Sequence, residues 1–463
     1  MRSGLFLVAL LLVCASLDTW AGDWPEFMGP TRDQISNETE LLEVLPKDGP
    51  RLLWEKPVGK GYSAPSIRGD LLVVFHRLGK EEIVEALDVR TGEARWRFAY
   101  PTRYIDPFGY NDGPRCTPLL TTDRCYTFGA EGLLLCLDLA NGKVIWHRET
   151  QKDFDVPEAF FGVGSSPILE EGMLIVQVGA QPNSCVVAFD AATGKTIWEN
   201  GGEKSWTGVP MTGWPGERTV TWNRADPTYE KQASYCTPVA ATIHGKRHIL
   251  VVSRQGLISF EPKTGAVNFS FWFRSRQNET VNAMTPVVSG DLVFLSTAYY
   301  RFGSVLLRVK PDGKSVEEVW RGTQLEIHWT TPVLHDGHLF AFTGRNEPDA
   351  HFRCVELATG KVKWDRTEAW PNGVHGRVRR GDEPNVFGRG SAILAEGKLI
   401  ALGEAGLLGL FQANAEKIEE ISRWQVPQLA YPCWAAPVLA NRVLYLRDED
   451  HLLCFDFAKP SAP

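Results

Sequence analysis

The chain lacks the short motifs that mark several common enzyme classes. It contains no Gly-x-Ser-x-Gly, no His-Glu-x-x-His and no glycine-rich phosphate-binding loop. These absences exclude a nucleophile-elbow hydrolase, a zincin protease and a P-loop nucleotide hydrolase. The ten histidines are scattered, and pairs such as His244 with His248 flank glycine turns. We therefore expect these histidines to be solvated turn residues.

The nine cysteines lack the spacings of redox and haem motifs. No Cys-x-x-Cys and no Cys-x-x-Cys-His is present, which excludes a thioredoxin-type site and covalent attachment of a c-type haem. Cys125 and Cys136 fall on the two strands of one predicted hairpin and would face each other, as a disulfide or as two buried thiols. Cys354 and Cys454 take the position of Cys136 in their own repeat units, which favours a packing role.

The chain has neither a strong positive charge nor, beyond its N-terminus, a long apolar segment. Its net charge is −7, and its one local arginine cluster, at 377–380, has Asp382 and Glu383 beside it. This composition argues against nucleic acid as a main partner. No segment after the N-terminus is long and apolar enough for a transmembrane helix.

Residues 1–21 predict a secretory signal peptide. A basic start is followed by an apolar run from Leu5 to Val13, with a plausible cut after Ala21. Cys14 follows Val13, where a lipoprotein site requires a small residue, so we do not expect lipid anchoring at Cys14. The sequence thus predicts export, to the periplasm or cell envelope or into the medium.

A repeated phrase dominates the remaining sequence. An acidic residue ends an apolar run, Thr-Gly or Asn-Gly follows, and Trp lies four residues after the Gly. The four clear copies span 87–96, 137–146, 189–198 and 355–364. The Thr-Gly or Asn-Gly dipeptide predicts a hairpin turn. A period of roughly fifty residues predicts an array of equal β units. We expect the Trp, or its substitute, to pack against the next unit and its indole N–H to bond a backbone carbonyl. The predicted docking residues are Trp54, Trp96, Trp146, Trp198, Phe269, Trp320, Trp364 and Trp424.

A second phrase, a small residue followed by Pro and an apolar run, opens the units. Copies include Ser63-Ala64-Pro65 and Thr330-Thr331-Pro332. Small residues and Pro suit innermost strands, whose axial edge is unpaired. The chain begins with an isolated outer-type strand at Trp54 and ends with three inner-type strands, and together these make one unit. The sequence thus predicts an all-β fold, an eight-bladed β-propeller of four-stranded antiparallel blades closed by the N-terminal strand. We expect a signal peptide at 1–21, an extension at 22–50, the propeller at 51–458 and a tail at 459–463.

The Asp-x-x-Thr-Gly-Lys-x-x-Trp phrase resembles the tryptophan-docking repeat of the quinoprotein-type, or PQQ-like, β-propeller family. The resemblance covers nearly all of the chain after residue 21. It implies the propeller fold. The family includes both pyrroloquinoline quinone (PQQ) dehydrogenases and a non-enzymatic, BamB-like branch.

The resemblance also implies what a PQQ enzyme needs. Such enzymes hold the quinone on a Trp, cover it with a disulfide between adjacent cysteines, and bind Ca²⁺ through Glu, Asn and Asp side chains. This chain has no adjacent cysteine pair, and no such ligand set can be placed on its repeats. We therefore expect no cofactor, with PQQ and Ca²⁺ as the alternative.

Long connections between units predict the functional face. They run at about 99–113, 150–162, 200–234, 274–281, 366–387 and 425–432. Long loops on a rigid scaffold commonly carry binding sites. Candidate contact residues on this face are Tyr104, Tyr110, Trp206, Trp214, Trp370 and His375. The alternative is that these aromatic residues hold the loops to the propeller.

Residues just before the inner strands should line the mouth of the central channel. Arg115 and Arg389 would make this mouth cationic, and the neighbouring side chains could bind a planar polar ligand. The candidates are Arg115, Tyr235, Asn282, Trp329 and Arg389. The alternative is a water-filled entrance without a function.

Together these features predict an exported, non-catalytic binding or scaffolding propeller of the bacterial cell envelope. Its partner would be an envelope protein or an extended polymer on the long-loop face. A PQQ-dependent oxidoreductase with a divergent site is the alternative, and carbohydrate binding by the Trp-rich loops is a third possibility.

Overall fold

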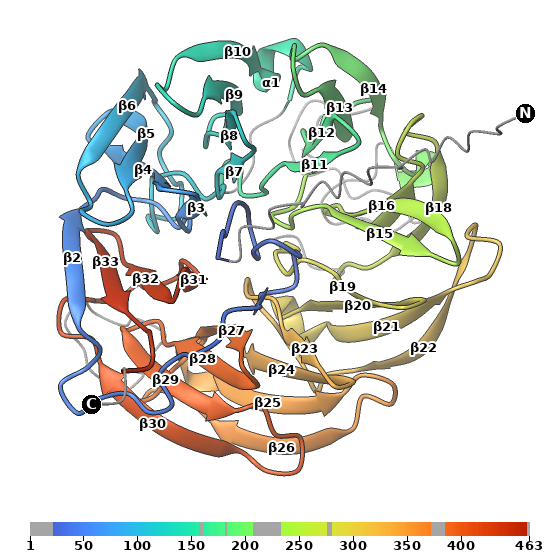
Figure 1. Ribbon diagram of the computed structural model, residues 1–463. Coiled ribbons are helices and arrows are strands. Elements are labelled where there is room, and N and C mark those ends of the chain that lie inside the picture. The colour runs from blue at the N-terminus through green and yellow to red at the C-terminus, as the bar shows by residue number, and fades with distance from the viewer. Residues whose placement is uncertain are drawn as a thin grey trace, which may run out of the picture.

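The computed structural model describes residues 22–156, 161–180, 183–206, 233–275, 280–371 and 385–460. In these residues eight β-sheets are arranged around a central axis (Figure 1), and each holds four antiparallel strands from the inside outward, with a fifth, parallel strand added to one of them. The predicted signal peptide, Trp214 and His375 lie outside the described residues.

Blades 1 to 4 lie between residues 66 and 272. Their strands are β3 (Ser66–Arg68), β4 (Leu71–Leu78), β5 (Glu81–Asp88) and β6 (Ala94–Pro101); β7 (Leu119–Leu120), β8 (Arg124–Phe128), β9 (Leu133–Asp138) and β10 (Val144–Glu149); β11 (Ile168–Glu170), β12 (Met173–Gln177), β13 (Val186–Asp190) and β14 (Thr196–Asn200); β15 (Val239–Ile243), β16 (Lys246–Val252), β17 (Gly256–Phe260) and β18 (Val267–Trp272). Short helices α1 (Thr150–Asp153) and η1 (Lys204–Trp206) follow β10 and β14.

Blades 5 to 8 complete the ring. Their strands are β19 (Val287–Ser289), β20 (Leu292–Thr297), β21 (Gly303–Val309) and β22 (Val316–Gly322); β23 (Val333–His335), β24 (His338–Thr343), β25 (His351–Glu356) and β26 (Val362–Thr367); β27 (Ser391–Ala395), β28 (Lys398–Leu402), β29 (Leu407–Gln412) and β30 (Glu419–Gln425); β31 (Val438–Ala440), β32 (Val443–Arg447), β33 (His451–Asp456) and β2 (Leu52–Pro57). Helices η2 (Tyr299–Arg301) and η3 (Glu347–Asp349) lie in the strand connections of blades 5 and 6.

The two ends of the chain build the eighth blade together. Strand β2 pairs antiparallel with β33, with Trp54 opposite Cys454. Arg447 on β32 is buried and donates hydrogen bonds to the carbonyls of Ser63, Gly59 and Phe75 in or next to blade 1. These contacts join the last blade to the first. The structure thus confirms the eight-bladed ring and its closure by the N-terminal strand.

The repeated Trp residues connect neighbouring blades. Trp96 donates its indole N–H to Leu139 O at 2.7 Å, and its ring packs on Gly142 of the next turn, where a Cβ would lie 2.4 Å away. Positive φ and this close approach both require Gly there. Equivalent indole bonds to the following blade are made by Trp54, Trp146, Trp198, Trp320 and Trp364.

Two blades depart from this pattern. Phe269 has no N–H to donate, and its ring lies 6.0 Å from the ring of His248 in its own blade. Trp424 packs on Gly49 of the N-terminal segment and lies edge-on to Phe455 of blade 8. Here a segment from outside the repeats supplies the glycine contact.

The cysteines are free thiols within the described residues. The expectation that Cys125 and Cys136 face each other is wrong, because Cys125 pairs with Leu137 while Cys136 pairs with Tyr126. This register places the two thiols on opposite faces of the sheet, in separate core clusters. Cys136, Cys354 and Cys454 each lie opposite a docking Trp, where a small side chain is needed.

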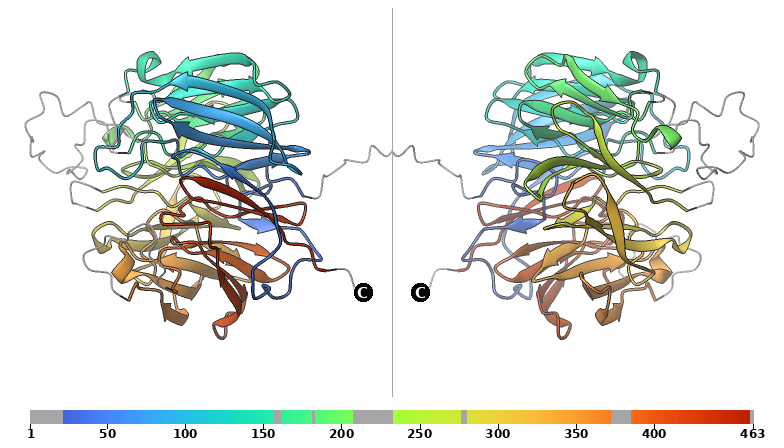
Figure 2. Two further views of the ribbon diagram at one scale, coloured as in Figure 1. Left: turned by 90° about the vertical axis from the view of Figure 1, so that its left-hand side faces the viewer. Right: turned by 90° about the vertical axis from the view of Figure 1, so that its right-hand side faces the viewer.

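The N-terminal segment runs across the axis at the face of the tight turns (Figure 1), on the same side as the C-terminus (Figure 2). Trp24 exchanges backbone hydrogen bonds with Ile67 of blade 1, and Leu120 N of blade 2 donates to Pro25 O. Arg32 reaches Leu169 O in blade 3. Strand β1 (Ile35–Ser36) pairs in parallel with β27 of blade 7. The segment therefore ties several blades together at this end of the axis, blades 1, 2, 3 and 7 among them, a role that the sequence did not reveal.

Candidate functional site

Residues that precede the inner strands converge around the axis on the long-loop face. Trp434 lies at the centre of this group, which we call the mouth cluster and define by Tyr62, Trp329, Trp434, Arg115 and Arg389. The ring of Trp434 lies 4.9 Å from that of Tyr62 and 4.8 Å from that of Trp329. Blades 1, 6 and 8 are thus joined by aromatic contacts at the predicted channel mouth.

Arg389 connects blade 7 to this cluster. Its guanidinium lies 4.6 Å from the ring centre of Trp329 and 5.5 Å from that of Trp434. It also forms an ion pair of 2.9 Å with Glu404, whose side chain is fully buried and accepts the indole N–H of Trp434 at 3.1 Å. Arg389 is therefore fixed between two rings and a buried carboxylate.

Arg115 has a matching arrangement on the opposite side of the cluster. It pairs with the buried carboxylate of Asp106 at 2.7 Å and lies 5.6 Å from the ring centres of Tyr62 and of Tyr104. The sequence predicted a cationic mouth. The structure corrects this, because a carboxylate that the sequence analysis did not single out neutralises each arginine.

His328 extends the network toward blade 5. Its ring nitrogens lie 3.2 Å from the Tyr299 hydroxyl and 3.3 Å from Arg389 Nη1. Loss of solvent around the ring, and then the positive charges of Arg389 and Arg345, lower the pKa of His328 well below its usual value. The imidazole is therefore neutral at pH 7.

Tyr235 and Asn282 play different parts at the mouth. The Tyr235 hydroxyl accepts the backbone N–H of Phe161 at 2.9 Å, and burial raises the pKa of Tyr235 to about 12. Asn282 is buried, and its amide donates to the carbonyls of Ser253 and Phe273. Asn282 thus connects the start of blade 5 to blade 4, and its amide N–H groups are already bonded to backbone carbonyls.

The loop-face candidates divide into buried and exposed residues. Trp206 and Trp370 are buried, at 5.5 Å from the Trp272 ring and 6.0 Å from the Tyr431 ring. This arrangement fits the alternative that they hold loops to the propeller. Tyr104 lies under Arg115, whereas Tyr110 is 56% exposed and touches Trp434.

The loop that carries Tyr110 also exposes Ile105 and Phe108, by 75% and 50%. Its backbone is held by side chains of the same loop, since Phe108 N donates to Asp106 and Asp106 N donates to Asp112, both at 2.9 Å. Arg77 of blade 1 donates to the carbonyls of Tyr104 and Asp112. The loop therefore presents apolar side chains on an ordered backbone.

The described residues contain no group of three or more His, Cys, Asp or Glu side chains that could hold a metal ion. The carboxylates of the mouth cluster, Asp106 and Glu404, are engaged by arginine. The tilted Trp329 and Trp434 rings, 4.8 Å apart, leave no gap for a planar group between them. Nor is any helix in the described part long and apolar enough to cross a bilayer.

Known proteins resemble this chain at the level of the family and fold. Polyvinylalcohol dehydrogenase from Sphingopyxis sp. (strain 113P3) is 22% identical over 346 residues, which are 60% of this chain and 50% of that protein. The chain therefore spans about half the length of that curated relative. BamB from Moraxella catarrhalis aligns with a TM-score of 0.55 and 13% identity, over 89% of this chain and 99% of that one.

A europium-containing methanol dehydrogenase aligns with a TM-score of 0.62 and 12% identity, over 94% of this chain and 89% of that one. At these identities the structural likeness shows the fold alone. The sequence profile of the family described as "Outer membrane protein assembly factor BamB" matches residues 34–210 and 79–366. The matched segments cover most of the chain, which belongs to this family of PQQ-like β-propellers.

Proposed function

We propose that this protein is an exported, non-catalytic binding propeller whose long-loop face docks a protein of the bacterial cell envelope. The observation that carries the proposal is the exposed apolar loop of Ile105, Phe108 and Tyr110 beside the mouth cluster. Large apolar side chains that are exposed together on a rigid loop are typical of protein interfaces. The predicted signal peptide supports export.

The order of this loop favours binding. Asp106, Asp112 and Arg77 fix its backbone in the unbound protein. A preorganised loop loses little conformational entropy when a partner binds, so more of the contact energy contributes to affinity. The aromatic and ion-pair contacts of the mouth cluster support the loop from below, because Tyr110 packs on Trp434 and Asp106 pairs with Arg115.

Site-specific photo-crosslinking in cells of the source organism would test this proposal. A photoreactive residue at position 105 should capture a discrete envelope protein. The matched control is position 197, an Ile that is 47% exposed on β14 at the outer edge of blade 3. Ile105→Asp should abolish co-purification of the captured protein, whereas Ile197→Asp should leave it intact. Equal capture at both positions would contradict the proposal.

A PQQ-dependent oxidoreductase remains the second candidate, favoured by the similarity to polyvinylalcohol dehydrogenase. The lack of a metal-ligand cluster in the described residues opposes it. Purified protein titrated with PQQ and Ca²⁺ should show no saturable cofactor absorbance and no dye reduction with alcohols. Stoichiometric quinone binding with turnover would replace the docking proposal by this one.

A further inference from the structure

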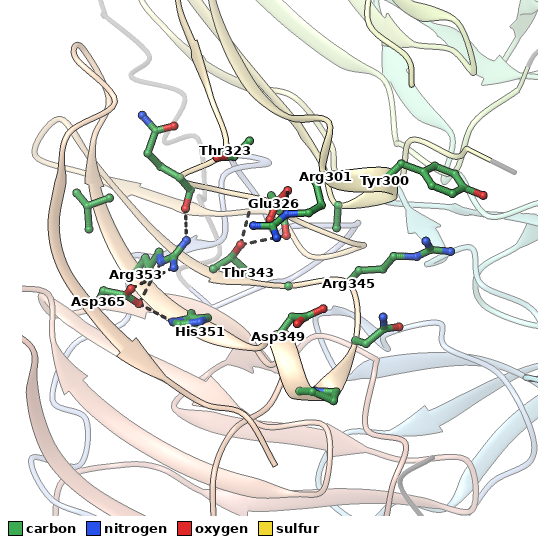
Figure 3. A pocket seen from close by; sticks show the side chains of 16 residues that line it. Tyr300, Arg301, Thr323, Glu326, Thr343, Arg345, Asp349, His351, Arg353 and Asp365 are labelled. Carbon is green, nitrogen blue, oxygen red and sulfur yellow. Dashed lines mark hydrogen bonds and ion pairs between the residues drawn. The ribbon is translucent and has the colours of Figure 1, made fainter. Parts of the chain in front are cut away.

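A polar pocket of about 680 Å³ lies between blades 5 and 6 on the long-loop face (Figure 3). Its walls come from η2, from residues 323–326 after β22, from η3 and from the start of β25. These segments carry no repeated motif, because most of them lie in connections that differ between units. The volume lies in the range of ordinary small-molecule sites.

The base of the pocket is rigid. His351 Nδ1 lies 2.8 Å from Asp365, and Arg353 pairs with the same carboxylate at 3.0 Å while donating to Gln324 O at 2.6 Å. On the adjoining wall the Thr343 hydroxyl bridges the backbone N–H and carbonyl of Glu326. These contacts fix the shape of the pocket without a ligand.

Two arginines on the pocket wall differ in how much of their charge is engaged. Arg345 lies 4.6 Å from the ring centre of Tyr299 and 5.0 Å from that of Tyr300, and it forms no ion pair with any carboxylate in the described part of the chain. Arg301 is 84% exposed at its side chain and forms a loose ion pair of 3.6 Å with Glu326, beyond hydrogen-bond distance, so it can still turn toward a ligand. Figure 3 shows Arg345 extending toward Tyr300 and Arg301 reaching toward Glu326.

The backbone beside these arginines is unusual. Tyr300 and Arg301 are consecutive residues in the left-handed region, with φ of 55° and 56°. Residues other than Gly and Asn seldom adopt this conformation, and such strain clusters at ligand sites. Tyr300 is 38% exposed beside the pocket, where one face of a ligand could stack on its ring.

From these features we infer that the pocket binds a sugar unit that carries a carboxylate. Arg345 and Arg301 would bind the carboxylate, since guanidinium groups match its geometry. Asn346, Asp349 and Thr323, which also line the pocket, offer both donors and acceptors for sugar hydroxyls. Tyr300 would contact the apolar face of the ring. The inference stands apart from the protein-docking proposal, because it depends on different loops.

Titration with sodium glucuronate, followed by saturation-transfer NMR, tests the inference. Glucose and acetate serve as the neutral sugar and the bare anion. We expect saturable binding of glucuronate, and at least ~10-fold weaker binding of glucose and of acetate, because each lacks one of the two recognised features. Equal binding of all three, or no binding of glucuronate, would overturn the inference.

Variants locate the binding. Arg345→Ala should weaken glucuronate binding by ~10-fold or more, through loss of a charge-assisted contact, and Tyr300→Ala by about 3-fold or more. Arg51→Ala is the matched control, since Arg51 is 73% exposed with one ion pair to Asp456. Thermal unfolding of each variant checks that the ring is intact. Unchanged binding in folded Arg345→Ala would overturn the inference. A Tyr300→Ala variant that no longer binds the envelope protein but still binds glucuronate with unchanged affinity would also overturn the inference.

Discussion

The tryptophans of this propeller fall into two groups that differ in how they are used. The outer group, such as Trp96 and Trp146, repeats one contact in which an indole bonds the carbonyl of the next blade and covers a glycine turn. The inner group, Trp329 and Trp434, takes the position just before the inner strand of its repeat unit, where the residue type changes from blade to blade. Both rings meet Arg389, which pairs with Glu404. A residue type that repeats thus marks residues that hold the ring together, and a position where the type varies marks the candidate site.

Removing an outer Trp should have the largest effect on stability. Trp146→Ala deletes a buried indole and its 3.0 Å bond to Ala191 O, and should lower the free energy of unfolding by about 3–5 kcal/mol. Trp329 is only partly buried, so Trp329→Ala should cost clearly less. Denaturant titrations of both variants measure the contrast, and equal losses would remove the distinction between the groups.

The buried ion pair of the mouth cluster should give the next largest effect. Glu404→Gln leaves Arg389 without its carboxylate in a buried setting, and should lower the free energy of unfolding by about 3 kcal/mol. Glu416→Gln is the control, because Glu416 is 82% exposed in its pair with Lys363 and should change stability by less than about 0.5 kcal/mol. If Glu404→Gln lowered the free energy of unfolding by no more than Glu416→Gln does, the mouth cluster would be solvated.

The mouth cluster should also respond to pH through His328. Its pKa is lowered in the folded state, so the unfolded chain takes up a proton first as pH falls below about 6.5, and stability is lost. Between pH 7 and 5.5 wild type should lose about 1 kcal/mol more than His328→Gln. His147→Gln, on the exposed outer edge of β10, should keep the wild-type slope. Parallel slopes for all three proteins would contradict this account.

The smallest effect is expected from reduction. Since Cys125 and Cys136 point to opposite faces of their sheet as free thiols, dithiothreitol should leave the melting temperature unchanged. Thiol titration of the unfolded mature chain without reductant should find eight reactive groups. A drop in melting temperature on reduction would instead indicate a disulfide.

Local sequence predicted the ring because its signals are repeated. The Thr-Gly turns, the docking Trp and the small-Pro inner strands recur at nearly constant spacing, and the unpaired Trp54 strand indicated how the ring closes. The predicted pairing of Cys125 with Cys136 was wrong by one residue, because hairpin spacing alone does not determine which residues pair.

The candidate site was predictable only in part. Because the start of each inner strand must lie near the axis, the sequence predicted that Arg115, Trp329 and Arg389 lie together at the mouth of the channel. Their partners Asp106 and Glu404 could not be found in this way. Asp106 lies in an irregular loop, and Glu404 lies in the turn between β28 and β29.

The sequence by itself determined the number of blades, their closure and the residues that join them, since each depends on short-range patterns that recur. The tertiary structure alone decided the neutralised charge of the mouth, the segment tying blades together across the axis, and the pocket between blades 5 and 6. The segment and the pocket arise where groups far apart in the chain meet, whereas the ion pairs of the mouth join residues only 9 and 15 positions apart across irregular loops. Burial and charge there depend on the packing of several loops, which no local pattern specifies.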